Sequence, residues 1–149
     1  MTTTLFHLAF PVVDIPSTKA FYAEGLGCLC GRESERSLIL RLYGHQLVAH
    51  AVGHTLPTQK GIYPRHFGIV FVEEHPWLAL VERVQERKLT FYQRPKVRFP
   101  DTPLEHRTFF LQDLSGNLLE FKHYKFDSAI FGETEFHQIG DPAPLTVRA

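Results

Sequence analysis

The sequence lacks several features that would point to particular classes of protein. Only two of its 149 residues are cysteines, Cys28 and Cys30, and they lie too close together for an ordinary structural disulfide, so we expect reduced thiols. Acidic and basic residues balance at 16 each. No basic field therefore favours nucleic acid or an anionic membrane, and a small molecule remains the expected partner.

Membrane-spanning and secretion signals are also missing. No stretch reaches the apolar length that crosses a bilayer, and the first residues lack the basic segment and apolar run of a signal peptide. These absences predict a cytoplasmic protein. The length suits one domain with a real hydrophobic core, and we expect that domain to span residues 1–149.

A polar turn followed by a short apolar strand stands out near the end of the chain. Residues 113–117 include Asp, Ser, Gly and Asn, which tolerate tight turns and positive φ, so they predict the tip of a hairpin. Side chains alternate faces along the returning strand, residues 118–124, which contains Glu120. Both faces carry apolar residues, so we expect Glu120 to be buried. A buried carboxylate needs a cation, a hydrogen-bond network or a metal to compensate it.

The first half of the chain predicts one strand, one helix and three further strands. Residues 5–13 have the apolar, β-rich composition of a strand, and the Asp-Ile-Pro-Ser segment after them supplies the cap and first turn of a helix that ends near Gly25. Three strand-length runs follow, at residues 28–35, 37–42 and 45–52. A tight turn at Tyr43 and Gly44 joins the last two, and residues 54–64 have the Pro and Gly content of a linker.

The same pattern then begins again, which indicates an internal repeat. Residues 7–14 (HLAFPVVD) can be laid over residues 66–73 (HFGIVFVE) with an offset of 59 residues (66 − 7), matching a histidine, a small residue, apolar positions and an acid. A second helix follows, with Pro76 in its first turn. Strand-length runs come next, at residues 91–99, 108–112 and 118–124, and Pro95 marks an edge or a bend in the first of them. We therefore predict two βαβββ modules, at about residues 5–53 and 65–125, and an extension at residues 126–149.

Two histidines and one carboxylate occupy matching places in these modules. His7 and His66 each lie in the first strand of a module, and Glu120 lies in the last strand of the second. A single histidine in such a strand is more often a structural core residue than a ligand. As a set that a pseudo-twofold arrangement can bring together, the three residues match the facial triad, which suits Fe(II) and also accepts Mn, Co, Ni or Zn.

These features resemble the vicinal oxygen chelate superfamily, also described as glyoxalase, bleomycin-resistance protein and extradiol dioxygenase. The resemblance covers about residues 5–125 and rests on the segments His7-Leu-Ala-Phe, Phe21-Tyr22 with Leu26-Gly27, His66-Phe-Gly and Asp113-Leu-Ser-Gly-Asn-Leu-Leu-Glu120-Phe. One departure is Leu114, where these families often have proline, and it concerns the turn more than the chemistry. The resemblance implies an α+β fold in which the two modules form a half-open mixed β-barrel. It also implies that His7, His66 and Glu120 bind a divalent metal, and that the protein is a homodimer.

The resemblance also raises the question of a fourth ligand, which would come from the last strand of the first module. Gln46, Val48 and His50 share one face of that strand. His50 is the preferred candidate and Gln46 the weaker one, and either can instead orient a ligand by a hydrogen bond. On the final strand Tyr124 shares the face of Glu120 and is the candidate catalytic acid, base or hydrogen-bond donor, with an aromatic rim position as the alternative.

Residues around and beyond the second module offer further binding groups. Four basic residues flank the Pro-rich segment and are candidates to bind a carboxylate or other oxyanion, although solvation at the surface is the default: Arg94, Arg98, His106 and Arg107. Apolar residues within 126–136 are candidates to cover a dimer interface or the mouth of a pocket. After Gly140 we expect a flexible tail.

Such a metal site supports three reactions, because open positions on the metal can bind two neighbouring oxygens of a small molecule. Fe(II) or Mn(II) would support extradiol ring cleavage, Ni or Zn would support glyoxalase-type proton transfer, and Mn would support epoxide opening by a thiol. We expect a dioxygenase-like enzyme with Fe(II) or Mn(II), because the triad matches that branch without a fourth protein ligand. The alternatives are a glyoxalase-type lyase or isomerase with Ni(II) or Zn(II), and a metal-free small-molecule-binding protein of the bleomycin-resistance kind.

Overall fold

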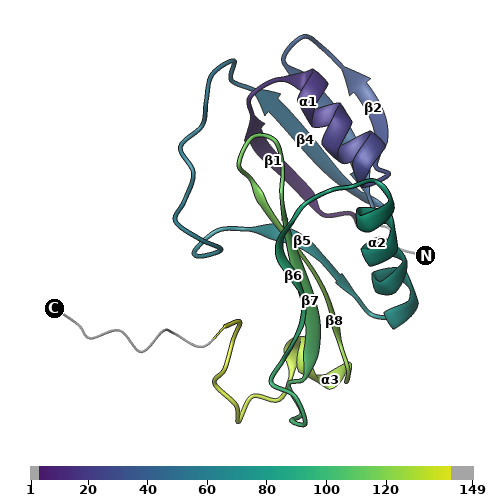
Figure 1. Cartoon of the computed structure of the whole chain (residues 1–149), viewed down its shortest axis with the longest axis vertical. Coiled ribbons are helices and arrows are strands. Elements are labelled where there is room, and N and C mark those ends of the chain that lie inside the picture. Colours follow the sequence, from purple (N-terminus) through teal and green to yellow (C-terminus); the bar gives the residue numbers. More distant parts are fainter. Residues whose placement is uncertain (1–3, 142–149) are drawn as a thin grey trace, which may run out of the picture.

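The fold consists of two four-stranded sheets, each with one long connection that carries a helix (Figure 1). The computed structural model describes residues 4–141. The first sheet has the order β1-β4-β3-β2 and the second has the order β5-β8-β7-β6. The strands are β1 (His7–Val12), β2 (Leu29–Glu33), β3 (Ser37–Leu42), β4 (His45–Ala51), β5 (Phe67–Phe71), β6 (Phe91–Arg98), β7 (His106–Gln112) and β8 (Leu118–Tyr124). The helices are α1 (Ile15–Lys19), its π-helical continuation η1 (Ala20–Gly25), α2 (Glu74–Glu86) and α3 (Ser128–Phe131).

The first module forms where local signals in the sequence are strongest. Asp14 caps α1 by accepting a hydrogen bond from the backbone N–H of Ser17, and η1 ends at Gly25 as predicted. Tyr43 and Gly44 have φ values of 47° and 86°, which the tight hairpin between β3 and β4 requires. Strand β1 pairs in parallel with β4, and the other pairs are antiparallel, so the sheet is mixed.

The second module repeats this topology, with β5 parallel to β8. Helix α2 buries Trp77, Leu80 and Val84, the apolar stripe of the sequence, and Nε1 of Trp77 donates to the backbone carbonyl of Phe121 at 2.8 Å. Strand β6 contains Pro95 and lies at the sheet edge with shifts in its register, which confirms the predicted edge or bend. Strand β7 begins at His106, two residues earlier than predicted, because the hairpin pairs His106 with Tyr124.

The turn at residues 113–117 joins the two modules. The Asp113 carboxylate accepts hydrogen bonds from the backbone N–H groups of Ser115 and Asn117 and, through Oδ2, from the Tyr22 hydroxyl at 2.7 Å. Ser115 Oγ accepts from the backbone N–H of Val13 at 2.9 Å. The hairpin tip predicted from the sequence is therefore also a connection between the second module and the strand that opens the first.

One hydrophobic core contains residues of both modules. Each sheet packs one face inward, and the inward residues of both sheets form a single cluster with the helices; its largest fully buried members include Trp77, Tyr22, Phe109 and Phe121. The other face of each sheet carries candidate site residues, with His7 on the first sheet and Glu120 on the second. The structure confirms the α+β class with two βαβββ modules, and the sheets do not close, as expected of a half-open barrel. Across residues 4–141, no helix has the length and apolar character needed to cross a membrane. The predicted tail after Gly140 falls mostly on residues 142–149, which lie outside the described residues.

Candidate metal centre

Glu120 lies in the middle of β8, between β5 and β7. It pairs with Gly68 on β5 and with Phe110 on β7. A Cβ atom at Gly68 would clash with the backbone carbonyl of Glu120, so this close approach requires glycine. Only 6% of Glu120 is exposed, which agrees with the burial predicted from the sequence.

Both oxygens of the Glu120 carboxylate have partners. Oε1 lies 3.0 Å from Nε2 of His66 and 4.0 Å from Nζ of Lys122. Oε2 accepts hydrogen bonds from Nη1 of Arg98 at 3.0 Å and from Oγ1 of Thr108 at 2.6 Å. The buried negative charge is therefore compensated on one side by fixed donors, while the other side faces an imidazole.

His66 is oriented by its own backbone surroundings. Its Nδ1 lies 2.7 Å from the carbonyl oxygen of Ile62, which can only accept, so Nδ1 carries a proton. In neutral His66 the Nε2 atom then presents a lone pair to Oε1 of Glu120, which is also an acceptor. Two lone pairs that face each other at this distance need a cation between them, either a proton that makes His66 an imidazolium or a metal ion.

The charges of this pair are coupled. The hydrogen bond with Glu120 raises the pKa of His66 above its ordinary value of 6.5, against the opposing effect of burial. Burial acts to raise the pKa of Glu120, but the hydrogen bond with His66, together with Lys122, Thr108 and Arg98, outweighs it and lowers the pKa from 4.5 to about 2. Glu120 is thus ionised over the physiological pH range and remains available as an anionic ligand.

His7 lies on the other sheet, at the exposed start of β1. Its Nδ1 lies 2.8 Å from Oε1 of Gln46, its partner in the register of β1 and β4. The amide oxygen accepts the proton of Nδ1, so in neutral His7 the Nε2 lone pair points away from Gln46. Gln46 therefore orients His7 in the same way that the carbonyl of Ile62 orients His66.

His50 makes no contact with His7 or His66 among the hydrogen bonds of residues 4–141. It is exposed, pairs with Pro11, and its Nδ1 lies 3.0 Å from the hydroxyl of Ser37. Within residues 4–141 no group of three or more His, Cys, Asp or Glu side chains could hold a metal ion. One chain therefore brings together His66 and Glu120, but leaves His7 and His50 on the first sheet.

The registers of the two modules identify the position that corresponds to Glu120. Gly68, two residues after His66, pairs with Glu120, and Ala9, two residues after His7, pairs with Val48. The first module thus has an apolar residue where the second has its carboxylate. The register of the strands determines this correspondence, and it cannot be deduced from the sequence.

Tyr124 lies on the same face of β8 as Glu120, near the end of the strand. It packs against His106 with ring centroids 4.8 Å apart, and Nζ of Lys122 lies 5.3 Å from the centre of its ring. Tyr124 and His106 line a cavity of about 410 Å³ whose opposite wall is residues 129–140. The extension beyond the second module therefore covers a pocket, which was one of the two roles that its apolar composition suggested.

The basic residues of the Pro-rich region do not act as one group. Arg94 is exposed, whereas Arg107 lies over the ring of Trp77, with its Cζ 4.6 Å from the ring centre. Arg98 is 5% exposed and His106 is 3% exposed, so surface solvation was the wrong default for these two. The pairing of Arg98 with His106, across the loop that separates β6 from β7, places both on the face of Glu120.

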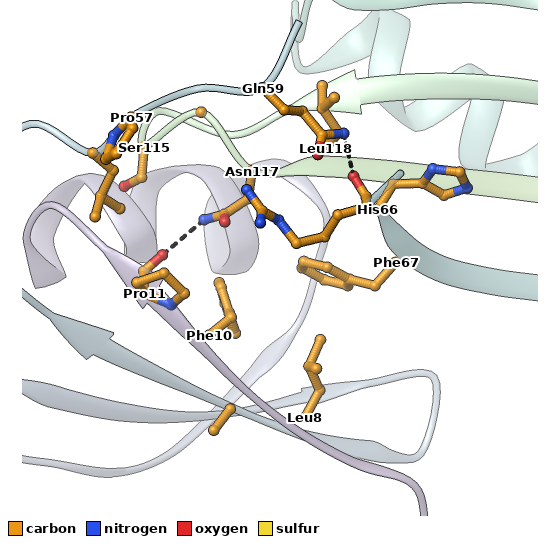
Figure 2. A pocket seen from close by; sticks show the side chains of 14 residues that line it. Leu8, Phe10, Pro11, Pro57, Gln59, His66, Phe67, Ser115, Asn117 and Leu118 are labelled. Atoms are coloured by element: carbon orange, nitrogen blue, oxygen red, sulfur yellow. Dashed lines mark hydrogen bonds between the residues drawn. The ribbon is translucent and has the colours of Figure 1, made fainter. Parts of the chain in front are cut away.

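A second cavity, of about 380 Å³, lies between the two modules (Figure 2). Its walls include Leu8, Phe10, Phe67 and Leu118, and Asn117 donates to the backbone carbonyl of Pro11 at its rim. Figure 2 shows that the imidazole of His66 points away from this space. His66 is nevertheless one of the residues that line the cavity, whereas Glu120 is not, so the cavity borders the His66–Glu120 pair without including the carboxylate.

The chain is similar to a known family and to several solved structures. The model of the glyoxalase/bleomycin resistance protein/dioxygenase superfamily matches residues 4–121. No curated protein gives a significant match. Among solved structures, a glyoxalase/bleomycin resistance protein/dioxygenase from Alicyclobacillus acidocaldarius is 37% identical, with a TM-score of 0.82 over 87% of this chain and 97% of that one.

More distant structures share the fold. The genomically encoded fosfomycin resistance protein FosX from Listeria monocytogenes is 15% identical, with a TM-score of 0.65 over 87% of this chain and 99% of that one. A mutant of FosX complexed with Mn(II) and 1S,2S-dihydroxypropylphosphonic acid is 17% identical, with a TM-score of 0.64 over 88% of this chain and 98% of that one. The family match covers most of the chain and the likeness extends over the whole fold, so this protein belongs to the glyoxalase/bleomycin resistance protein/dioxygenase superfamily.

Proposed function

We propose that this protein is a divalent-metal-dependent, dioxygenase-like enzyme that acts on a small molecule with two neighbouring oxygen atoms. The observation that carries this proposal is the arrangement of His66 and Glu120, whose Nε2 and Oε1 atoms face each other at 3.0 Å. Ile62 holds the proton of His66 on Nδ1, and Arg98 and Thr108 hold the other oxygen of Glu120. A nitrogen and an anionic oxygen with their lone pairs converging are the donors that a divalent transition metal takes.

The third ligand in this proposal is His7 of a second copy of the chain. His7 is exposed, and Gln46 leaves its Nε2 lone pair directed outward, so it is available to another molecule. The faces that carry His7 and Glu120 are both turned away from the shared core. A homodimer in which the first sheet of one chain faces the second sheet of its partner would complete the triad. His50, bonded to Ser37, and Gln46, bonded to His7, then serve outside the ligand set.

A three-ligand set supports the dioxygenase-like branch over the glyoxalase-type one. Val48 occupies the position equivalent to Glu120 in the first module and has no donor atom. Fe(II) or Mn(II) is the preferred metal, and the Mn(II) in the FosX complex of the same fold is in keeping with this choice. When bound, the metal would act as a Lewis acid and a template for the two oxygens of the substrate.

The remaining residues of the site orient Glu120, keep it ionised, or exchange protons and hydrogen bonds with the substrate. Arg98 and Thr108 hold Glu120 in one orientation, and Arg98 and Lys122 keep it ionised through their positive charge. Tyr124, on the same face, is the proposed acid, base or hydrogen-bond donor toward the substrate. Tyr124 lines a cavity of about 410 Å³, which is large enough for a small organic molecule.

Metal analysis tests the proposal. The protein is purified without an affinity tag or chelator, and its metal content is measured by elemental analysis beside His7→Ala, His66→Ala and Glu120→Gln. His75→Ala, an exposed histidine on α2, is the matched control. We expect Fe or Mn near one per chain in the wild type and the control, and loss in the other three variants. Oxygen uptake with a panel of catechols then tests the reaction.

Mixed dimers test the shared site. When His7→Ala and His66→Ala chains with different tags are co-expressed and the heterodimer is isolated, one of its two sites has all three ligands. We expect one metal ion for each heterodimer and almost none in either parent. If the heterodimer contains as little metal as its parents, the shared site is contradicted. Ni or Zn in the wild type would favour glyoxalase-type chemistry over dioxygenase-like chemistry. If the wild type binds no metal at all, the proposal of a metal-dependent enzyme is refuted.

A further inference from the structure

The end of the described chain brings a partly exposed carboxylate, that of Asp141, to the cluster around Glu120. Oδ1 of Asp141 accepts hydrogen bonds from Nζ of Lys96 and Nε of Arg98, both at 2.8 Å. The backbone N–H of Asp141 donates to the hydroxyl of Tyr63 at 2.7 Å. Gly140, with a φ of 66°, packs so closely on Tyr63 that a side chain there would clash with the hydroxyl. We call residues 132–141 the C-terminal strap.

These contacts use only some of the hydrogen-bond donors of Arg98. Its Nη1 donates to Glu120 and its Nε donates to Asp141, but its Nη2 is buried and has no hydrogen-bond partner within residues 4–141. Nε and Nη2 form one edge of the guanidinium, which matches two oxygens of a carboxylate, phosphate or phosphonate. Asp141 uses a single oxygen on that edge. A buried donor left unpaired costs free energy that a bidentate anion would recover.

The position of Arg98 connects this edge to the proposed metal ligand. The same guanidinium contacts Glu120 through Nη1 and Asp141 through Nε. The cavity of about 410 Å³ beside it is walled by His106 and Tyr124 on the sheet and by the strap up to Gly140. An anion that replaced the Asp141 carboxylate would therefore lie next to the face on which the chemistry is proposed.

The strap is held by few interactions. Residues 132–141 contain no helix or strand, and Ile139 within them is 91% exposed. Asp141 makes two ion pairs. The pair with Lys96 is partly exposed, at 38% and 27%, and exposed ion pairs contribute at most about 1 kcal/mol, so the pair with the buried Arg98 is the main attachment of the strap. Little apolar burial opposes the release of the strap, whereas the sheet beneath it is part of the buried structure.

We propose that Lys96 and Arg98 form a subsite for an oxyanion group of the substrate, and that Asp141 occupies this subsite as an internal anion that the substrate displaces. The inference rests on the proposed function in one respect only, that the substrate binds on the face of Glu120. It adds to that function the class of substrate, a small molecule that carries a carboxylate, phosphate or phosphonate beside its metal-binding oxygens.

Anion binding by metal-free protein tests the subsite independently of the metal. Methylphosphonate and acetate are titrated in EDTA by calorimetry, with the amide signal of Asp141 followed by NMR. We expect Asp141→Asn to bind methylphosphonate about tenfold more tightly than the wild type, as for a subsite that the strap fills about nine-tenths of the time. Asp127→Asn is the matched control, because its side chain makes no hydrogen bond within residues 4–141, and it should bind as the wild type does.

Variants of the cations identify where the anion binds. In the Asp141→Asn background, Lys96→Gln and Arg98→Lys should each weaken binding about tenfold, since the first removes a charge and the second removes the guanidinium edge. If Arg98→Lys does not fold, the result for Lys96→Gln shows whether the anion binds here, because Lys96 is partly exposed and its substitution should not prevent folding. Equal affinity in the wild type and Asp141→Asn, or no binding by either, refutes the displaceable anion. Anion binding that persists in protein that takes up no metal refutes the proposed function and leaves the subsite standing.

Discussion

The charge of Glu120 can be removed with little change in volume by the substitution Glu120→Gln. The amide oxygen of glutamine can still accept from Arg98 and Thr108, and its NH2 group can donate to Nε2 of neutral His66. The substitution therefore isolates the contribution of charge from that of packing and hydrogen-bond count.

The loss in free energy of unfolding caused by Glu120→Gln can be worked out from the pKa of Glu120. A fall from 4.5 to about 2 on folding corresponds to about 3 kcal/mol, at about 1.4 kcal/mol for each pKa unit. A similar loss, about 3–5 kcal/mol, is typical when one partner of a buried ion pair is removed. Asp141 still faces Arg98 in the variant, so we expect the lower value. At pH 7 the free energy of unfolding should fall by about 3 kcal/mol.

Urea unfolding in EDTA, followed by Trp77 fluorescence, measures this loss without a contribution from metal. Glu86→Gln, an exposed glutamate near the end of α2, is the control and should change stability by less than about 0.5 kcal/mol. If Glu120→Gln costs less than about 1 kcal/mol, the value of a surface ion pair, the cluster around Glu120 is not the buried compensated site described above.

Two further predictions concern the connection between the modules and the dependence on pH. Tyr22→Phe removes the buried hydrogen bond to Asp113 and should cost about 1–2 kcal/mol in urea unfolding, whereas the exposed Tyr92→Phe should cost almost nothing; equal effects would contradict the role of the turn. The raised pKa of His66 stabilises the metal-free protein fully below pH 6.5, and this contribution is lost as the pH rises through the folded-state pKa. The stability advantage of the wild type over His66→Gln should therefore shrink as the pH rises above 6.5 in EDTA, and a difference that stays constant with pH would contradict the ionised pair. The depressed pKa of Glu120 acts in the opposite direction, with stability present above pH 4.5 and lost as the pH falls toward about 2.

Much of the fold could be predicted from the sequence because its signals are local. The boundaries of β3 and β8 match the predicted runs, and the histidine repeat identified both modules. The short helix α3 was not predicted, since four residues without a side-chain cap carry little pattern. The burial of Glu120 also followed from local alternation along one strand.

The partners of Glu120 were harder to predict. Arg98 and Thr108 reach it through the register of β6, β7 and β8, and two irregularities in the pairing of β6 with β7 make that register unreadable from the sequence. Asp141 contacts Arg98 from a segment without secondary structure, so no periodic pattern in the sequence predicts this contact. The sequence placed His7 and His50 in the first module, but whether they approach Glu120 depends on how the two modules dock, which is a tertiary property.

The contacts of the turn at residues 113–117 have a consequence for synthesis of the protein. Tyr22 meets Asp113 across 91 residues of sequence, and Asn117 meets Pro11 across 106. A nascent chain that has completed only the first module lacks both partners and the inward face of the second sheet. We expect its apolar residues to stay exposed until the last hairpin, which ends at Tyr124, leaves the ribosome, and the protein to be most prone to aggregate before then.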